Sequence, residues 1–340
     1  MISLLNLSKT SVIRTKLINT EKHQDSMEKL RVNKNKIFAG EREVILRGVS
    51  IPDCYWLNEK ENQTVEGVIA KIKELGFNAV RIPVLPGHFA FYDDYVEKVI
   101  SKVVELCKRH QLYCIIDWHA IGNPIHNEAR LKQYHHLKDG KETYWYCPDK
   151  DLAKKGLARL SKKFGGEDHV IFEIFNEPAP GDKPIPKIGL SALPFEEWRK
   201  IALELVIEIR KSSSNLVIVS PTFWAFNLKE ILQAPILDVP NIAYSFHCYP
   251  IKQNQTWREM LDAAKNFPVI VTEFGYDADE KSKYNASYET YLKPFMSYLK
   301  ENKISWVGWC FSTSWRPRIV KTWAPFRLSE FGENLLLEVH

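Results

Sequence analysis

The sequence predicts a single-domain α/β protein built as a (β/α)8, or TIM, barrel. From about residue 44, short runs rich in β-branched residues alternate with longer stretches that have helical periodicity. Eight such short runs occur, and in most of them polar residues follow the apolar part. Eight parallel strands with polar residues at their C-terminal ends are typical of this barrel, whose functional sites lie at that face.

The expected elements follow one another in a regular order. The eight strands are expected to begin at Val44, Asn78, Leu112, Val170, Asn215, Ile242, Pro268 and Ser305. Amphipathic helices are expected at 65–75, 95–109, 152–164, 195–212, 256–266 and 284–301. Several strands are almost continuously apolar at their N-terminal ends, as expected when helices cover a parallel sheet. A doubly wound dinucleotide-binding sheet would need a GxGxxG motif after its first strand, and that motif is absent.

The N-terminal part of the chain differs from the rest. We expect residues 1–39 to form a partly disordered tail and residues 40–340 to form the barrel. The first 26 residues place Lys9 and Arg14 after a short apolar stretch, whereas a secretory signal carries its charge before one. A more ordered-looking stretch begins at Met27.

Composition excludes several classes of protein. The 340 residues carry a net charge of +5 without a dense Lys/Arg block, so nucleic acid is not an expected partner. No apolar run approaches the ~18 residues of a membrane span. The six cysteines form no CxxC pair and are expected to be buried thiols, although a disulfide remains open. The 10 Trp, 14 Tyr and 17 Phe favour a surface that stacks on a flat ligand.

Two glutamates suggest the chemistry. Glu177 and Glu273 each end an apolar strand, where a charged side chain is costly unless it has a partner or a function. Each could simply meet water or pair with an arginine. Two carboxyl groups about 5–5.5 Å apart at one end of a barrel would suit retaining glycoside hydrolysis.

Six segments resemble the signature segments of glycoside hydrolase family 5, the cellulase-type retaining glycosidases. The segments are RIPV with Arg81, DWHA with His119, FNEP with Asn176 and Glu177, HCYP with His247 and Tyr249, TEFG with Glu273, and WVGWC with Trp309. Their order and their positions at strand ends match as well as their letters. The resemblance covers roughly residues 40–330.

The resemblance implies a role for each matched residue. Glu177 would be the general acid/base and Glu273 the nucleophile. Arg81 and Tyr249 would hold Glu273 charged and oriented, and Asn176 would hydrogen-bond the sugar 2-hydroxyl. His119 and His247 would bind hydroxyl groups or tune Glu177, and Trp309 would offer a flat face to a pyranose ring. Each supporting residue also has a structural alternative: an ion pair for Arg81, core hydrogen bonds for the histidines and barrel packing for Trp309.

The implied activity is hydrolysis of a β-1,4-linked polysaccharide by a retaining endo-glycosidase, with glucan as the foremost substrate. A mannanase, a xylanase and a β-1,3-glucanase of the same family are alternatives, because the loops at 123–151 and after Glu177 match no particular subgroup. The resemblance implies no cofactor, no metal, a monomer and net retention of configuration. A polysaccharide substrate favours an extracellular location, although no clear export signal is visible.

The sequence is also compatible with other classes of protein. A metal-dependent hydrolase would draw on His119, His126, His135, His136 and His247, but the sequence has no HExxH and no HxH after the first strand. A non-enzymatic carbohydrate-binding barrel would be favoured by the loss of either glutamate, and both are present. An interaction protein is a weaker third possibility.

Overall fold

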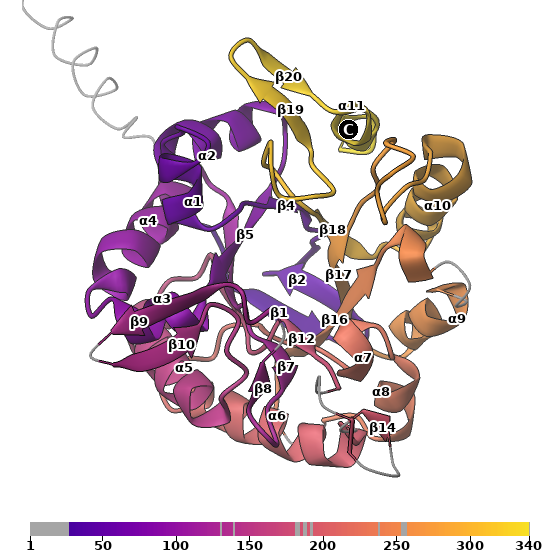
Figure 1. The fold of residues 1–340 in the computed structure, drawn as a ribbon. Coiled ribbons are helices and arrows are strands. Elements are labelled where there is room, and N and C mark those ends of the chain that lie inside the picture. The colour runs from indigo at the N-terminus through magenta and orange to yellow at the C-terminus, as the bar shows by residue number, and fades with distance from the viewer. Residues whose placement is uncertain are drawn as a thin grey trace, which may run out of the picture.

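A closed barrel of eight parallel strands forms the centre of the molecule in the computed structural model (Figure 1). The structure describes residues 27–129, 131–138, 140–180, 184–185, 189–190, 193–236, 239–252 and 257–339. The barrel strands are β4 (Arg47–Ser50), β5 (Ala79–Val84), β6 (Tyr113–Trp118), β11 (Val170–Glu173), β15 (Val217–Val219), β16 (Ile242–Cys248), β17 (Val269–Phe274) and β18 (Ser305–Gly308). Each lies within one of the eight predicted runs, so the predicted fold class is confirmed.

Helices surround the barrel on its outside (Figure 1). They are α1 (Cys54–Glu59), α2 (Val65–Glu74), α3 (Pro86–Phe91), α4 (Ser101–Arg109), α5 (Lys150–Phe164), α6 (Phe195–Arg210), α7 (Thr222–Ala225), α8 (Lys229–Gln233), α9 (Trp257–Leu261), α10 (Lys293–Glu301) and α11 (Glu330–Leu336). Single π-helical turns, η1 (Val96–Ile100) and η4 (Tyr288–Leu292), precede α4 and α10, and short 3-10 turns, η2 (Pro250–Lys252) and η3 (Asp262–Lys265), flank α9. All six predicted helices are present, whereas α1, α3, α7, α8 and α11 were not predicted because they are short.

The helix α5 shows how local sequence and packing agree. Asp149 caps its N-terminus by accepting a hydrogen bond from the backbone N–H of Leu152 at 2.8 Å. Its buried residues recur with helical spacing and face the sheet. Gly156 lies against the buried ring of Trp118, where a Cβ atom would come within 2.1 Å of the ring. Only glycine therefore lets α5 pack this closely on β6.

The interior of the barrel is layered. One apolar cluster joins the lower inward-facing side chains of the strands, among them Ala79, Ile115 and Ile270. Two positions further along their strands, Arg81, Asp117 and Thr272 are buried and polar. Because side chains alternate along a strand, positions two apart share the inner face. The polar layer therefore lies directly above the apolar one, toward the C-terminal ends of the strands.

A small antiparallel sheet covers the N-terminal end of the barrel (Figure 1). It consists of β1 (Leu30–Asn33), β2 (Lys36–Ala39) and β3 (Arg42–Glu43). Leu30 and Ile37 pack into the same apolar cluster as the barrel floor. The expected boundary at residue 40 placed β1 and β2 in the tail, whereas the structure packs them against the barrel. The expected disorder of residues 1–26 lies outside the described residues.

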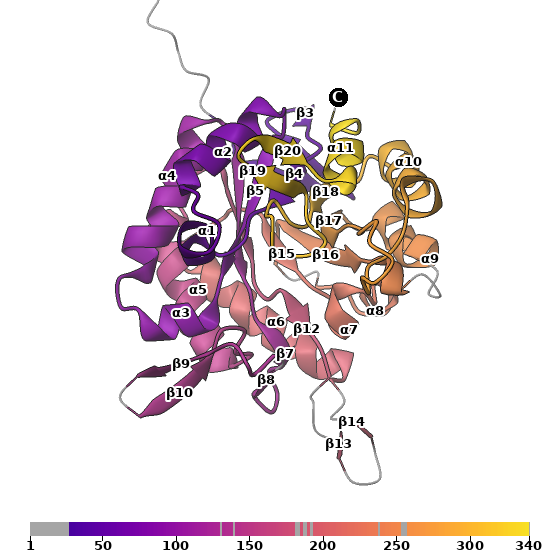
Figure 2. The same ribbon diagram turned by 45° about the horizontal axis from the view of Figure 1, so that its top comes forward.

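Two hairpin-like loops leave the C-terminal side of the barrel near the short strands β7 (Ile121–Asn123), β8 (Glu128–Ala129) and β12 (Glu177–Pro178) (Figure 2). One carries β9 (His135–Lys138) and β10 (Lys141–Tyr144), and the other carries β13 (Pro184–Ile185) and β14 (Gly189–Leu190). A further hairpin, β19 (Val320–Trp323) and β20 (Phe326–Leu328), follows the last barrel strand.

Two expectations drawn from composition can be compared with the structure. None of the six cysteines, all of which lie among the described residues, forms a disulfide; five are buried and Cys147 is half-buried. Among the described residues, no helix combines the length and the apolar character needed to span a bilayer.

Candidate active site

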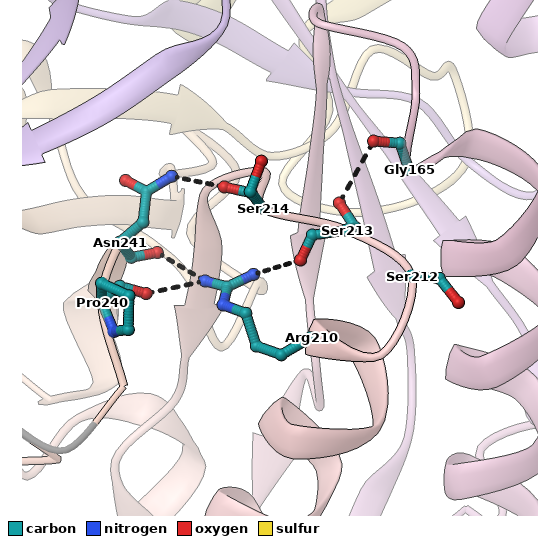
Figure 3. A pocket seen from close by; sticks show the side chains of 7 residues that line it. All are labelled: Gly165, Arg210, Ser212, Ser213, Ser214, Pro240 and Asn241. Carbon is teal, nitrogen blue, oxygen red and sulfur yellow. Dashed lines mark hydrogen bonds between the residues drawn. The ribbon is translucent and has the colours of Figure 1, made fainter.

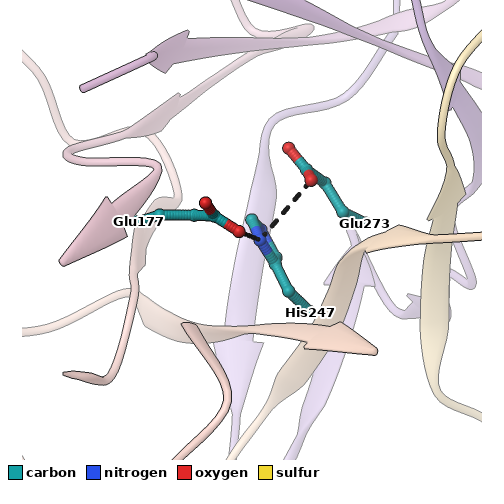
Figure 4. Close-up of side chains that lie close together, drawn as sticks. All are labelled: Glu177, His247 and Glu273. Carbon is teal, nitrogen blue, oxygen red and sulfur yellow. Dashed lines mark hydrogen bonds and ion pairs between the residues drawn. The ribbon is translucent and has the colours of Figure 1, made fainter. Parts of the chain in front are cut away.

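Glu177 and Glu273 face each other at the C-terminal end of the barrel (Figure 4). Glu177 begins β12, where its backbone N–H donates to the carbonyl of Ala120 at 3.0 Å, and Glu273 lies near the end of β17. A carboxylate oxygen of Glu177 lies within 4.8 Å of a carboxylate oxygen of Glu273. This approach is closer to the spacing of a retaining pair, about 5–5.5 Å between the carboxyl groups, than to that of an inverting pair, about 6.5–9.5 Å.

Two donors hold the Glu273 carboxylate. Arg81 Nη1 donates to Oε1 at 2.8 Å, and the Tyr249 hydroxyl donates to Oε2 at 2.8 Å. The side chain of Glu273 is only 6% exposed. Hydrogen bonds to both oxygens give the carboxylate a fixed orientation. The two residues that the sequence analysis expected to hold Glu273 therefore do contact it.

Arg81 is the centre of a buried polar network. Its Nε donates to Glu173 at 2.6 Å, and its Nη2 donates to the Asn176 side-chain oxygen at 2.6 Å and lies 3.0 Å from Asp117. Burial alone would lower the pKa of Arg81, but the facing carboxylates of Asp117, Glu173 and Glu273 raise it well above its usual value. Arg81 is therefore a permanent cation that orients the carboxyl and amide groups around it.

Asp117 and Glu173 were not among the predicted site residues. Burial raises the pKa of each carboxyl to about 7, against the opposing effect of Arg81. One arginine thus faces three buried carboxyl groups, and protons compensate part of the excess negative charge near neutral pH. The sequence does carry a signal for Glu173, because it interrupts the apolar run VIFEIF.

His247 links the two glutamates. Its Nδ1 lies 3.0 Å from Glu177 Oε1 and 3.6 Å from Glu273 Oε2, while its Nε2 lies 3.0 Å from the hydroxyl of Thr272. A β-bulge between Phe246 and His247 shifts the strand register and pairs His247 with Glu273 across β16 and β17. The expected contact of His247 with Glu177 is therefore present.

His119 and Trp309 form the remaining part of the site. Their rings stack in parallel, with centroids 5.5 Å apart, and His119 Nδ1 hydrogen-bonds to the Asp117 carboxylate. Burial, with Arg81 acting in the same direction, lowers the pKa of His119 to about 4, so its imidazole is neutral at neutral pH. Trp309 also packs in one cluster with Tyr249. All eight predicted site residues thus lie in one connected group.

The same group includes the one set of side chains, among the described residues, whose positions could hold a cation: Glu177, His247 and Glu273. Their facing atoms are already engaged, because Glu273 accepts from Arg81 and Tyr249 and Glu177 contacts His247. Of the five histidines considered for a metal site, this set contains His247 alone. The arrangement suits acid/base and nucleophilic chemistry better than metal binding.

The comparison with family models decides the relationship. The model described as Cellulase (glycosyl hydrolase family 5) matches residues 37–314. The chain belongs to glycosyl hydrolase family 5. The resemblance seen in the six signature segments is therefore confirmed.

Individual family 5 relatives are distant in sequence. Endoglucanase C of Evansella cellulosilytica is 26% identical over 309 residues, which cover 84% of this chain but 35% of that protein. Cellulase CelDZ1 of a Thermoanaerobacterium species is 25% identical over 312 residues, covering 85% of this chain and 74% of that one. The β-glucanase SdGluc5_26A of Saccharophagus degradans, solved with cellotetraose, has a TM-score of 0.79 at 22% identity, covering 92% of this chain and 93% of that one. The last comparison supports the family 5 barrel fold.

A separate hollow lies near the opposite end of the barrel from the family 5 site (Figure 3). Arg210, at the end of α6, donates to the backbone carbonyls of Ser213, Asn215, Pro240 and Asn241 at 2.9–3.3 Å. These contacts join the C-terminus of α6 to the segments that lead into β15 and β16. We interpret Arg210 as a structural link.

Proposed function

We propose that this protein is a retaining endo-β-1,4-glucanase that acts as a monomer, with Glu177 as general acid/base and Glu273 as nucleophile. The observation that carries the proposal is the pair of carboxylates within 4.8 Å, one of them held by a buried arginine and a tyrosine. A nucleophile must be held in one orientation, and the two donors to Glu273 favour it for that role. Every group in the site comes from one chain.

The proposed reaction has two steps. Glu273 attacks the anomeric carbon, and the glycosidic C–O bond breaks as Glu177 gives its proton to the leaving oxygen. Glu177 then takes a proton from a water molecule whose oxygen attacks the same carbon and displaces Glu273. Arg81 and Tyr249 hold Glu273 during both steps. Because Arg81 donates to the Asn176 side-chain oxygen, the amide nitrogen of Asn176 is the end that can donate to the sugar 2-hydroxyl.

Glucan is the proposed substrate because the relatives named above are called an endoglucanase, a cellulase and a β-glucanase, the last solved with cellotetraose. The aromatic residues beside the pair fit a sugar chain, because indole faces pack well on apolar faces of flat rings. The half-buried rings of Trp56 and Trp315 extend this aromatic surface away from Trp309.

The test is reducing-sugar release from a panel of carboxymethyl-cellulose, mixed-linkage β-glucan, glucomannan, xylan and laminarin. We expect release from the two β-1,4-linked glucans, and NMR of the first-formed product should show net retention of anomeric configuration. Release from glucomannan, xylan or laminarin alone would identify a mannanase, a xylanase or a β-1,3-glucanase instead. An inverted product would remove Glu273 as nucleophile, and no release would favour a sugar-binding barrel.

Replacing Glu177 by glutamine should lower polymer hydrolysis by about 10²–10⁴-fold, the usual contribution of a general acid/base. The basic limb of the pH profile should disappear as well, because that limb reports deprotonation of the acid. The first step with an aryl glycoside, whose leaving group needs little protonation, should be affected much less. The values of kcat/KM for both substrates measure this difference, because kcat/KM reports the first step, whereas kcat can be limited by the second. A retained basic limb with a normal rate would contradict the assignment of Glu177.

A further inference from the structure

A further buried carboxylate lies outside both the catalytic pair and the network around Arg81. Glu61 follows α1 and is only 8% exposed. Within the described part of the chain its carboxylate has no salt bridge, and the donors to that carboxylate come from the segment after β18 and from β19. A buried carboxylate without a cation is costly unless hydrogen bonds replace its water. The hydrogen-bond donors around Glu61 therefore explain how its carboxylate can be buried.

Four donors point at the Glu61 carboxylate. Oε1 accepts from the hydroxyls of Ser312 and Ser314, the latter at 2.6 Å. Oε2 accepts from the backbone N–H of Thr313 at 3.1 Å and from Trp323 Nε1 at 2.8 Å. Burial alone would raise the pKa of Glu61, but these hydrogen bonds outweigh it and lower the pKa. The carboxylate thus binds the loop after β18 to the hairpin that follows it.

Ser312 and Ser314, which donate to Glu61, also accept hydrogen bonds from two tryptophans. Ser312 Oγ accepts from the backbone N–H groups of Ser314 and Trp315 at 3.0 and 2.9 Å. Ser314 Oγ accepts from Trp56 Nε1 at 2.8 Å. Each hydroxyl thus accepts from tryptophan or loop N–H groups and donates its own hydrogen to Glu61. Glu61 holds the backbone of Trp315 through one serine and the ring of Trp56 through the other.

These two rings extend the aromatic surface of the site. The Trp315 ring centroid lies 5.7 Å from that of Trp309 and 6.0 Å from that of Trp56. Trp309 packs with Tyr249, which donates to Glu273. Trp56 and Trp315 are each half-buried, so part of each ring faces solvent. A row of three indoles therefore leads from the catalytic pair toward α1.

We propose that Glu61 is a positioning residue that sets Trp56 and Trp315 as one rigid wall for the distal part of a bound glucan chain. The inference rests on the proposed function. Glu61 lies on a different loop from the reacting groups and has no hydrogen bond to Glu177 or Glu273. Its contribution is to substrate binding, because fixed rings lose less conformational freedom when a ligand packs on them.

Glutamine cannot replace Glu61 in this network, although it has the same shape. Trp323 and the Thr313 backbone are obligatory donors to one side-chain oxygen of Glu61. The Ser312 hydroxyl already accepts from two N–H groups, so it meets the other oxygen only by donating its own hydrogen. The amide nitrogen of glutamine would face donors in either orientation. At least one hydrogen bond is lost, and the loop after β18 is released.

The test compares Glu61→Gln with Glu59→Gln. Glu59 is the exposed last residue of α1, so the control removes the same charge from the same segment. For Glu61→Gln we expect KM for mixed-linkage β-glucan to rise about tenfold with kcat and the pH profile unchanged, the signature of lost uniform binding. Acrylamide quenching of tryptophan fluorescence should increase, because Trp56 and Trp315 become mobile. Glu59→Gln should match the natural protein in every measurement.

Thermal unfolding establishes that each variant is folded at the assay temperature. Ser314→Ala, which removes only the link to Trp56, should raise KM in the same direction by a smaller factor, and it carries the test if Glu61→Gln does not fold. An unchanged KM in a folded Glu61→Gln, or a fall in kcat alone, would overturn the inference while leaving the proposed function intact. Failure of the natural protein to cleave any glucan would overturn the proposed function and this inference with it.

Discussion

Alanine in place of Glu273 should reduce kcat/KM for β-glucan by about 10⁴-fold or more, as expected when a group that forms a covalent intermediate is removed. The loss has two causes. No glycosyl-enzyme can form, and Arg81 loses one of its three carboxylate partners, the one it contacts at 2.8 Å. The measurement is the release of reducing sugar beside the natural protein, with circular dichroism to show that the variant is folded.

Azide distinguishes the two glutamates. In Glu273→Ala the anion can enter the space left by the side chain, attack the anomeric carbon from that face and form an α-glycosyl azide from an aryl β-glycoside. In the matched variant Glu177→Ala, azide attacks the glycosyl-enzyme from the opposite face and should form the β-glycosyl azide. Products of the reverse configuration would exchange the two assignments. Full polymer hydrolysis by a pure preparation of Glu273→Ala would show that it is not the nucleophile.

Replacing Arg81 by methionine should cost about 3–5 kcal/mol of unfolding free energy at pH 8, the usual penalty for breaking a buried charge network from one side. The substitution removes the arginine that pairs with Asp117, Glu173 and Glu273 and leaves their charges without that partner. Activity should be lost together with stability, because Glu273 loses a donor. Urea denaturation of the two proteins measures the penalty.

The penalty should be smaller at pH 5.5 than at pH 8. The pKa values of Asp117 and Glu173 are raised by burial to about 7 in the folded protein, against about 4 in an unfolded chain. A carboxyl whose pKa is raised by folding adds stability below its unfolded value, and that stability is lost as the pH rises through its folded value. Without Arg81 both pKa values should rise further, so the variant loses more stability than the natural protein as the pH approaches 8.

Arg210→Met is the matched control for this pH dependence. Arg210 is also a largely buried arginine, but its guanidinium donates to backbone carbonyls, which do not titrate. We expect its loss to destabilise the protein by a similar amount at both pH values. If Arg81→Met also showed a penalty independent of pH, the carboxyl groups around Arg81 would not be the source of the destabilisation.

Much of the barrel was predictable because its signals are local. An apolar run followed by a polar residue marks most of the strands and their C-terminal ends, and all eight runs became barrel strands. The same pattern marked Glu177 and Glu273, which the closed barrel then brought together. The N-terminal strands were missed because β1 and β2 are four residues each and become stable only by packing Leu30 and Ile37 on the barrel floor.

The sequence by itself determined the order of strands and helices, the face on which polar residues gather, the two facing glutamates and the resemblance to family 5. Only the tertiary structure decided which side chains contact one another. It places Glu173 and Asp117 around Arg81 and His247 beside both glutamates. It also brings Glu61 to the loop that carries Trp315 and to Trp323. The periodicity of apolar residues indicates which side chains of a single helix or strand are buried. A hydrogen bond depends on where distant segments meet, and Glu61 meets Ser312 across 251 positions because the last strand of the barrel closes beside the first.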